Sequence, residues 1–580
     1  MGDRLNMNGT VGEKRIKYHI LISLIIILQI IYITYVFAFK KNGYHSDELW
    51  NYGFANSSES ECIYVKDGKT INAYEWIDSS VLLDYISVDE SEIFDYKSIY
   101  ENATKDLNPP FQYFLLHAIS SIKTNTWSKW YCYIINILAF LITQVFLYKT
   151  LEMACGKSTG VYGILFFGFC AGAANITVYL RLYALGVAFA TMFFYYSFEF
   201  FNDRTCPEKT KRDLIKIMPV VFAGCLTMHQ FLVFAFSVAL FYSLYYLFKK
   251  DFRNLFLYGG ICLIAVLLSI AVFPYAFYHL FGYSNSESFG TVSVVYQLWD
   301  YLSFLFRDIT GVYISLTPTA SQAVIGMIIT VLVAVILIIF AFSKRKRWFI
   351  ELKSRMKNIL LDAKDNIKKR GFVLLPAAFS VVFIICVCSI NTNVFVMGVY
   401  SRRYLFLIYP VFAILLAALF GLIFNKRALM ILAILFSLLS NFVSDGAFLF
   451  RFKGDEEAFD KIEKNADCII VLKDLWVMTN AVNELYDTDK FYLTDRERYK
   501  ADNYDENIGS NNPVYLLIDV SDERDMREYG KDADFGDSLG YFSDKEEYLL
   551  YYSELPIAGQ IEYIGVDFLF DRKIEVYRLR

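Results

Sequence analysis

Two adjacent carboxylates are the strongest candidates for chemistry in this sequence. Asp47 and Glu48 lie a few residues past a long apolar stretch, between His45 and Trp50. A carboxylate near the low-dielectric boundary of a membrane has a raised pKa unless it is paired, which suits a general base acting on a hydroxyl. The same residues also fit the start of a solvated helix, with Asp or Ser as the N-cap and Glu in the first turn. These residues alone leave both interpretations open.

A second group of polar residues surrounds a Pro-Pro pair. Asn108 precedes Pro109 and Pro110, which stiffen the chain where a helix would begin. Tyr113 and His117 are four residues apart, so they share one face of that predicted helix. This face lies opposite most of the apolar residues. The two side chains therefore either line a cavity or face lipid headgroups.

Three arginines lie at span ends where membrane proteins place few cations. Arg181 stands at one predicted outer end, and Arg402 and Arg403 stand at another. A guanidinium presents a planar fork that matches phosphate oxygens, although arginines also extend toward lipid headgroups. Other side chains at predicted outer ends are further candidates for a cavity: Tyr183, His229 and Tyr404.

The composition indicates an integral membrane protein. Of 580 residues, 56% are apolar or aromatic and 20% are charged, against about 25% charged in an average soluble protein. Residues 18–39 are long enough for a span, and the basic residues before them place 1–17 in the cytoplasm. Further apolar stretches bring the expected number of spans to about eleven: 128–149, 158–177, 179–201, 214–228, 229–248, 254–279, 320–343, 371–390, 404–424 and 428–449.

The distribution of charge orients these spans. The loop 344–370 holds 11 Lys/Arg against 3 acidic residues, which predicts a cytoplasmic position. With eleven spans, the following segments are expected outside: loops 40–127, 280–319 and 391–403, and the tail 450–580.

Two segments test this count. Residues 109–123 carry apolar residues on one helical face, and a helix of about 20 Å is too short for a core of about 30 Å. We therefore predict an interfacial helix there instead of a span. Residues 214–248 are divided into two spans at His229, and one long tilted helix would change the topology.

The tail, 450–580, has a different character. Residues 451–580 carry 17 Lys/Arg and 31 Asp/Glu, a net charge of −14, whereas the rest of the chain carries +10. Short strand-like runs alternate with acidic segments, which predicts a small external α/β domain. No glycine-rich phosphate loop follows a strand, and no basic aromatic face suggests nucleic acid. The expected strands are 468–472, 491–493, 514–520, and 561–566 with 574–579 as a hairpin.

These motifs recur in a familiar order. The order is an Asp-Glu pair after the first span, a Pro-Pro-aromatic segment ending in His, an Arg-x-Tyr start to a span, a His at 229, and Arg-Tyr before a Leu/Pro-rich span. Over roughly residues 18–425 the sequence resembles the polytopic GT-C glycosyltransferases. The resemblance is to the family 39-like group of protein mannosyltransferases and lipid A aminoarabinose transferases. It implies a glycosyltransferase-like membrane domain at 18–449.

The resemblance also implies a reaction. Such enzymes take a sugar from a polyprenyl-phosphate carrier on the non-cytoplasmic side and invert the anomeric centre. Asp47 matches the catalytic acidic residue that accepts the proton of the acceptor hydroxyl, and Glu48 matches its partner. The resemblance assigns the carrier phosphate to Arg402 or Arg403 with Tyr404, assisted by Arg181.

Other readings and a possible metal stay open at this stage. A transporter or flippase of lipid-linked glycans is the main alternative, and a non-catalytic envelope scaffold is another. The central spans are nearly free of charge, which favours chemistry at the outer surface. Related sequences often carry His or Lys where Asn108 stands, so a cation or metal contact there is in doubt. No cofactor is assigned, and a divalent metal, which some GT-C enzymes use, is left open. The donor sugar and the acceptor, whether protein, lipid or glycan, are not readable here.

Overall fold

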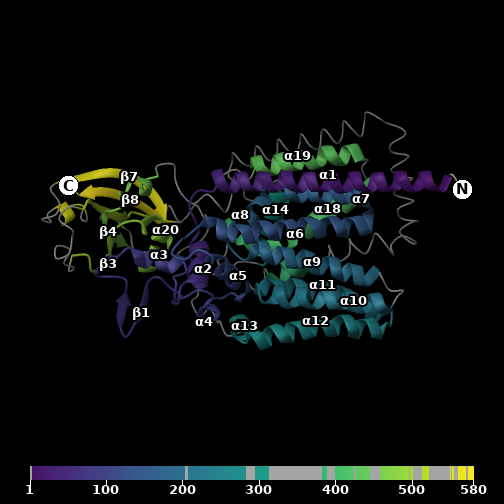
Figure 1. Ribbon diagram of the computed structural model, residues 1–580, viewed down its shortest axis with the longest axis horizontal. Coiled ribbons are helices and arrows are strands. Elements are labelled where there is room, and N and C mark those ends of the chain that lie inside the picture. The colour runs from purple at the N-terminus through teal and green to yellow at the C-terminus, as the bar shows by residue number, and fades with distance from the viewer. Residues whose placement is uncertain are drawn as a thin grey trace.

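The computed structural model consists of a long helical bundle with a sheet-containing domain at one end (Figure 1). The N-terminal end of α1 (Asp3–Phe39) and the sheet lie at opposite ends of this bundle. The structure describes residues 3–202, 207–281, 294–311, 382–387, 399–423, 426–443, 457–495, 497–500, 512–521, 549, 551–553, 560–569 and 572–579. The predicted fold class, a helical membrane body followed by a C-terminal α/β domain, is confirmed.

Several helices are long and apolar enough to cross a membrane. Among the described residues there are six such helices, or seven if one bent pair counts as a single span. They include the part of α1 at Tyr18–Phe39 and the segment Arg402–Gly421. The predicted span 320–343, the loop 344–370 and most of 371–390 lie outside the described residues. The remaining long helices are α6 (Lys129–Cys155), α9 (Tyr183–Asn202), α11 (His229–Phe248) and α12 (Phe252–Val272).

Shorter apolar helices complete the bundle. α10 (Pro207–Cys225) ends before α11 begins, so the predicted division at His229 is confirmed. The predicted external loop 280–319 contains α14 (Val294–Thr310), which packs against α19 (Lys426–Val443).

The expected span at 158–177 is not one continuous helix, because the chain bends near its middle. α7 (Lys157–Gly168) and α8 (Ala171–Val178) meet at an angle of 63°. Polar side chains of α19 satisfy the broken backbone. Ser440 Oγ accepts from Ala171 N at 2.8 Å, and Asn441 Nδ2 donates to the carbonyl of Phe169 at 2.7 Å. Irregular backbone at membrane depth persists only where such partners exist.

The predicted helix at 109–123 is present as α5 (Phe111–Ser120), and its surroundings decide between the two alternatives for its polar face. Its polar face is buried, with Tyr113 and His117 fully inaccessible, whereas Ile122 just beyond the helix is 80% exposed. The protein interior supplies hydrogen-bond partners for the polar face. His117 Nδ1 lies 2.8 Å from the carbonyl oxygen of Ala55. This contact excludes the headgroup-facing alternative for His117.

The segment after α1 is compact. It forms α2 (Ser46–Asn56), α3 (Ser80–Ile86) and α4 (Tyr96–Lys105), with a small hairpin of β1 (Tyr64–Lys66) and β2 (Lys69–Ile71). α2 lies at the junction between the bundle and the sheet domain (Figure 1).

The tail forms most of a six-stranded sheet of order β3-β5-β4-β6-β8-β7. The tail strands are β4 (Asp467–Leu472), β5 (Lys490–Asp495), β6 (Val514–Asp519), β7 (Ile561–Leu569) and β8 (Arg572–Leu579). Each matches a predicted strand, and β7 with β8 forms the predicted hairpin.

One strand of this sheet comes from far away in the chain. β3 (Trp76–Asp78) pairs antiparallel with β5, placing Trp76 opposite Tyr492 and Asp78 opposite Lys490. A single sheet cannot straddle a membrane, because open sheet edges are not tolerated in lipid. Residues 76–78 and the tail therefore lie on the same side of the membrane.

Candidate active site

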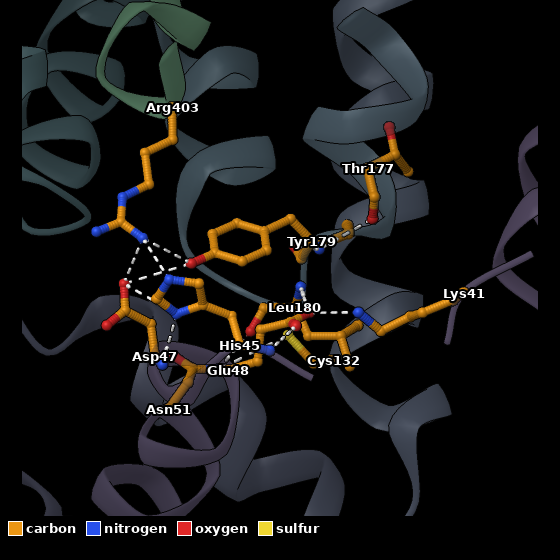
Figure 2. A network of polar contacts seen from close by, with 11 residues as sticks. Lys41, His45, Asp47, Glu48, Asn51, Cys132, Thr177, Tyr179, Leu180 and Arg403 are labelled. Carbon is orange, nitrogen blue, oxygen red and sulfur yellow. Dashed lines mark hydrogen bonds and ion pairs between the residues drawn. The ribbon is translucent and has the colours of Figure 1, made fainter. Parts of the chain in front are cut away.

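The first turn of α2 holds both carboxylates singled out from the sequence. His45, rather than Asp or Ser, is the N-cap, and its Nδ1 accepts from Asp47 N at 3.0 Å. Glu48 completes a capping box by accepting from His45 N at 2.8 Å. The helix-start interpretation is correct for the helix itself, but the N-cap is His45 and the helix start is largely buried instead of solvated. It does not exclude chemistry, because the two carboxylates point to different surroundings (Figure 2).

Asp47 faces an arginine from the other end of the chain. Its Oδ2 lies 2.9 Å from Arg403 Nη1 and accepts from the Tyr179 hydroxyl at 3.3 Å. The same Arg403 nitrogen donates to the Tyr179 hydroxyl at 3.0 Å and lies 3.3 Å from His45 Nε2. The side chains of Asp47 and Arg403 are 17% and 16% exposed, so the pair is partly open to solvent.

The environment keeps Asp47 ionised. Burial alone would raise the pKa of Asp47, but the nearby charges, Arg403 foremost, and the Tyr179 hydrogen bond outweigh it and hold that pKa below its ordinary value. Burial lowers the pKa of His45 to about 3, so its imidazole is neutral near pH 7. Asp47 is the carboxylate of this cluster that is available to accept a proton.

Glu48 points away from this cluster into a closed network. Its Oε1 accepts from Lys41 Nζ at 2.7 Å and from the backbone N–H of Leu180 at 2.8 Å. Burial raises the pKa of Glu48, although Lys41 and the two backbone N–H groups favour its ionised form. The Glu48 side chain has no exposed surface, so its surroundings are all protein.

Arg181, one of the three candidate arginines, contacts the polar residues around the Pro-Pro pair, which lie far from it in the sequence. Its Nη1 donates to the Tyr113 hydroxyl at 3.4 Å, and Tyr113 in turn donates to Asp106. Asn108 Nδ2 donates to the same carboxylate at 3.0 Å. The Nε of Arg181 is buried and has no hydrogen-bond partner among the residues that the structure describes. Tyr113 therefore contacts Arg181, one of the residues predicted to bind the carrier phosphate.

Arg402 has a different position from its neighbour. Its guanidinium is fully buried and donates to Asp308 at 3.1 Å. The Tyr409 hydroxyl donates to the same carboxylate at 2.9 Å. The two adjacent arginines, predicted to share one role, thus have separate acidic partners.

The remaining candidates divide into two groups. Tyr404 lies under the Arg403 guanidinium at 5.4 Å, and the Tyr183 ring lies 5.7 Å from that of Tyr179, so both line the Asp47 cluster. His229 instead faces His279 at 5.7 Å between ring centroids. In the described part of the chain, no hydrogen bond or ion pair joins His229 to Asp47 or Arg403.

Sequence reasoning did not single out Tyr179, Lys41 or Asp308 as site residues. Each carried a weak signal. Lys41 follows the first span directly, and Tyr179 directly precedes the Leu180-Arg181 pair. Asp308 directly follows Arg307 in the last turn of α14, after a largely apolar stretch, and adjacent ionisable residues in such a sequence often belong to an ion pair.

A metal site was left open from the sequence. Among the residues that the structure describes, no three His, Cys, Asp or Glu side chains cluster closely enough to hold a metal ion.

Comparisons with known proteins complete the description. No family model and no curated protein matches the sequence. Among solved structures, the chain is similar to ArnT from Cupriavidus metallidurans bound to undecaprenyl phosphate, with 10% identity, a TM-score of 0.47, and coverage of 96% of this chain and 97% of that one. Apo ArnT gives 9% identity, a TM-score of 0.43, and coverage of 91% and 95%. The Archaeoglobus fulgidus oligosaccharyltransferase in complex with Zn and sulfate gives 12% identity, a TM-score of 0.43, and coverage of 86% of this chain and 68% of that one.

Proposed function

We propose that this protein transfers a sugar from a polyprenyl-phosphate donor to an acceptor hydroxyl on the non-cytoplasmic side of the membrane. The observation that carries this proposal is the Asp47–Arg403 pair, 2.9 Å apart and partly exposed at the end of the membrane helices. A transfer of this kind needs a base for the hydroxyl, a cation for the departing phosphate, and positioning. The pair supplies the first two in direct contact.

Arg403 has an edge left over for phosphate. Within the described part of the chain, its contacts with Asp47, Tyr179 and His45 run through Nη1, and its buried Nε has no hydrogen-bond partner there. The Nε–Nη2 edge of a guanidinium is one of the forks that bind phosphate oxygens in a bidentate manner. Arg403 can therefore bind the carrier phosphate while it still holds Asp47.

This shared cation links donor binding to base strength. A phosphate on the second edge of Arg403 would divide the guanidinium charge between two anions. The pKa of Asp47 would then rise from its lowered value toward that of an effective base, because the attraction that stabilises the carboxylate is weaker. Asp47 would accept the acceptor proton, the hydroxyl oxygen would attack the anomeric carbon from the face opposite the phosphate, and the carrier phosphate would leave with inversion.

The test is an assay of purified protein in nanodiscs with a panel of polyprenyl-phosphate sugars. We expect release of sugar-free polyprenyl phosphate from at least one donor when a hydroxyl acceptor is present. The proposal would be overturned if the wild-type protein neither released polyprenyl phosphate from any donor of the panel nor bound any of these donors.

The bend between α7 and α8 favours a flippase as the second candidate. Broken helices whose ends point at a substrate are typical of transporters. A flippase would move a polyprenyl-linked sugar across a vesicle membrane without releasing carrier phosphate. Movement without release would therefore select this alternative.

The side of the membrane can be tested separately. Lys97 and Lys464 have side chains that are 86% and 84% exposed, one in the first loop and one in the tail. Cysteines introduced at both positions should react with an impermeant reagent added to intact cells. Protection of both would place the pair of segments in the cytoplasm.

A further inference from the structure

The connection between α8 and α9 is irregular backbone buried among helices. Tyr179, Leu180 and Arg181 have non-helical conformations and are at most 6% exposed. Buried backbone groups without hydrogen-bond partners destabilise a protein strongly, so this segment needs partners at defined positions.

Three polar side chains supply those partners. Glu48 of α2 accepts from the N–H of Leu180 at 2.8 Å, and Asn51, one turn later on the same helix face, donates to the Leu180 carbonyl at 3.2 Å. Asn136 of α6 donates to the Tyr179 carbonyl at 2.7 Å and to the Thr177 carbonyl at 3.1 Å. All three side chains are fully buried (Figure 2 shows Glu48 and Asn51).

The segment held in this way carries two side chains of the site. The Tyr179 hydroxyl reaches Asp47 at 3.3 Å and accepts from Arg403. Arg181 reaches Tyr113, and its buried Nε has no partner in the described ranges. The positions of both side chains depend on how the peptide units around Leu180 are fixed.

We propose that Glu48, Asn51 and Asn136 form a polar clamp that positions Tyr179 and Arg181 for the carrier phosphate. This inference rests on the proposed function. It makes Glu48 a positioning residue instead of a second proton acceptor. Its side chain has no exposed surface, and its carboxylate oxygens already accept hydrogen bonds from Lys41 and from backbone N–H groups. α2 thus carries both the base and the residues that place the phosphate ligands relative to it.

The structure offers a matched pair of variants. Asn51 and Asn56 lie on the same helix, are at most 1% exposed, and each donates its Nδ2 to a backbone carbonyl. Asn56 donates to Ile86, at 2.9 Å, so it holds a different segment. Asn51→Ala and Asn56→Ala should lower the thermal stability to a similar extent, since each leaves one buried carbonyl unpaired.

The measurement is the affinity of each variant for sugar-free polyprenyl phosphate in nanodiscs, together with turnover. A displacement of about 1 Å at a reacting group can cost on the order of 10²-fold in rate. We therefore expect Asn51→Ala to lose turnover to about that extent and to bind the carrier more weakly, whereas Asn56→Ala keeps both. Equal carrier affinity and turnover in the two variants would overturn the clamp. Failure of the wild-type protein to bind any carrier would instead overturn the proposed function.

Glu48→Gln separates positioning from catalysis. Glutamine keeps an acceptor for Leu180 but presents an N–H group toward the N–H of His45, which disturbs the clamp. We expect both carrier affinity and turnover to fall. Loss of turnover with wild-type carrier affinity would mean that Glu48 is itself a proton acceptor, and the clamp would be rejected.

Discussion

Arg402 and Arg403 are neighbours on one short helical segment, Val399–Ile408, yet they form opposite kinds of ion pair. The Arg402–Asp308 pair is 3.1 Å long and both side chains are fully buried. The Arg403–Asp47 pair is 2.9 Å long and both side chains keep about one sixth of their surface exposed. In the first pair Asp308 also accepts from Tyr409 and lies near Arg307 with no exposed surface, whereas both side chains of the second pair remain accessible to solvent.

This difference indicates which ion pair can exchange partners when a ligand binds. A closed pair has already lost its water and cannot exchange partners without exposing a buried charge, a change that costs several kcal/mol. An open pair can take a third group by shifting one hydrogen bond. We therefore interpret Arg402 as part of the scaffold that fixes its segment, and Arg403 as the contact for the carrier phosphate.

The largest effect should come from the acidic member of the open pair. Asp47→Asn keeps the shape of the side chain but removes the base, and loss of a positioned base typically costs about 10²–10⁴-fold in rate. Binding of sugar-free polyprenyl phosphate should be nearly retained. Asp95→Asn is a suitable control, because Asp95 caps α4 elsewhere in the same loop and asparagine is also a good N-cap. Wild-type turnover in Asp47→Asn would show that the base lies elsewhere.

The closed pair should respond through stability. Arg402→Met removes the buried cation nearer to Asp308 and leaves the longer contact with Arg307, and breaking a buried ion pair typically costs about 3–5 kcal/mol. Thermal unfolding in detergent should therefore shift strongly downward. The double variant Arg402→Met with Asp308→Asn should recover much of the loss, because the buried carboxylate is removed as well. A stable Arg402→Met protein that no longer binds polyprenyl phosphate would reverse the roles of the two arginines.

Arg403 should respond through affinity. Hydrogen bonds to charged groups contribute about 1.5–3 kcal/mol, so Arg403→Ala should weaken binding of polyprenyl phosphate by about 10- to 150-fold. Arg403→Lys should lie between Ala and wild type, because lysine keeps the charge but lacks the planar fork. Thermal stability should change little compared with Arg402→Met. Unchanged affinity in both variants would mean that Arg403 only anchors the protein near headgroups.

The smallest effect concerns the pH profile of kcat/KM, which reports groups of the free enzyme. Asp47 must be ionised to act, so activity is lost as the pH falls through its pKa. Because that pKa is held below its ordinary value, the acid limb should lie below the usual range for Asp. No limb should appear near pH 6.5, since the pKa of His45 is lowered to about 3. In Arg403→Ala the acid limb should move to higher pH. An unchanged limb would mean that another group titrates.

Local patterns predicted the elements better than their contacts. Apolar length and charge located most helices, and the alternation of short runs located the tail strands. The Asp47-Glu48 pair was recognisable because it stands a few residues after the first span, beside a histidine and a tryptophan. The sequence did not reveal the different surroundings of the two carboxylates. These depend on Lys41 and Leu180, which contact Glu48, and on Arg403, which contacts Asp47.

The features that the sequence left undetermined have a common physical source. The bend at Phe169 is stabilised by Ser440 and Asn441, which lie more than 260 residues away in the chain. The inward turn of the polar face of α5 likewise depends on the Ala55 carbonyl. A helical pattern read along the chain shows which face is apolar, but it does not reveal hydrogen-bond partners that tertiary structure brings to the other face.

The pairing of β3 with β5 has a consequence for how the protein is made. Residues 76–78 emerge from the ribosome more than 400 positions before Lys490–Asp495, so their strand must wait until the membrane helices have been inserted and the tail has been synthesised. Closing such a long loop adds little to its entropic cost beyond that of a shorter one, but it makes this contact a late event in folding. A fragment limited to residues 450–580 would lack β3 and leave β5 as an open edge, which invites pairing with other chains. The tail should therefore assemble correctly only when it is expressed together with the first loop.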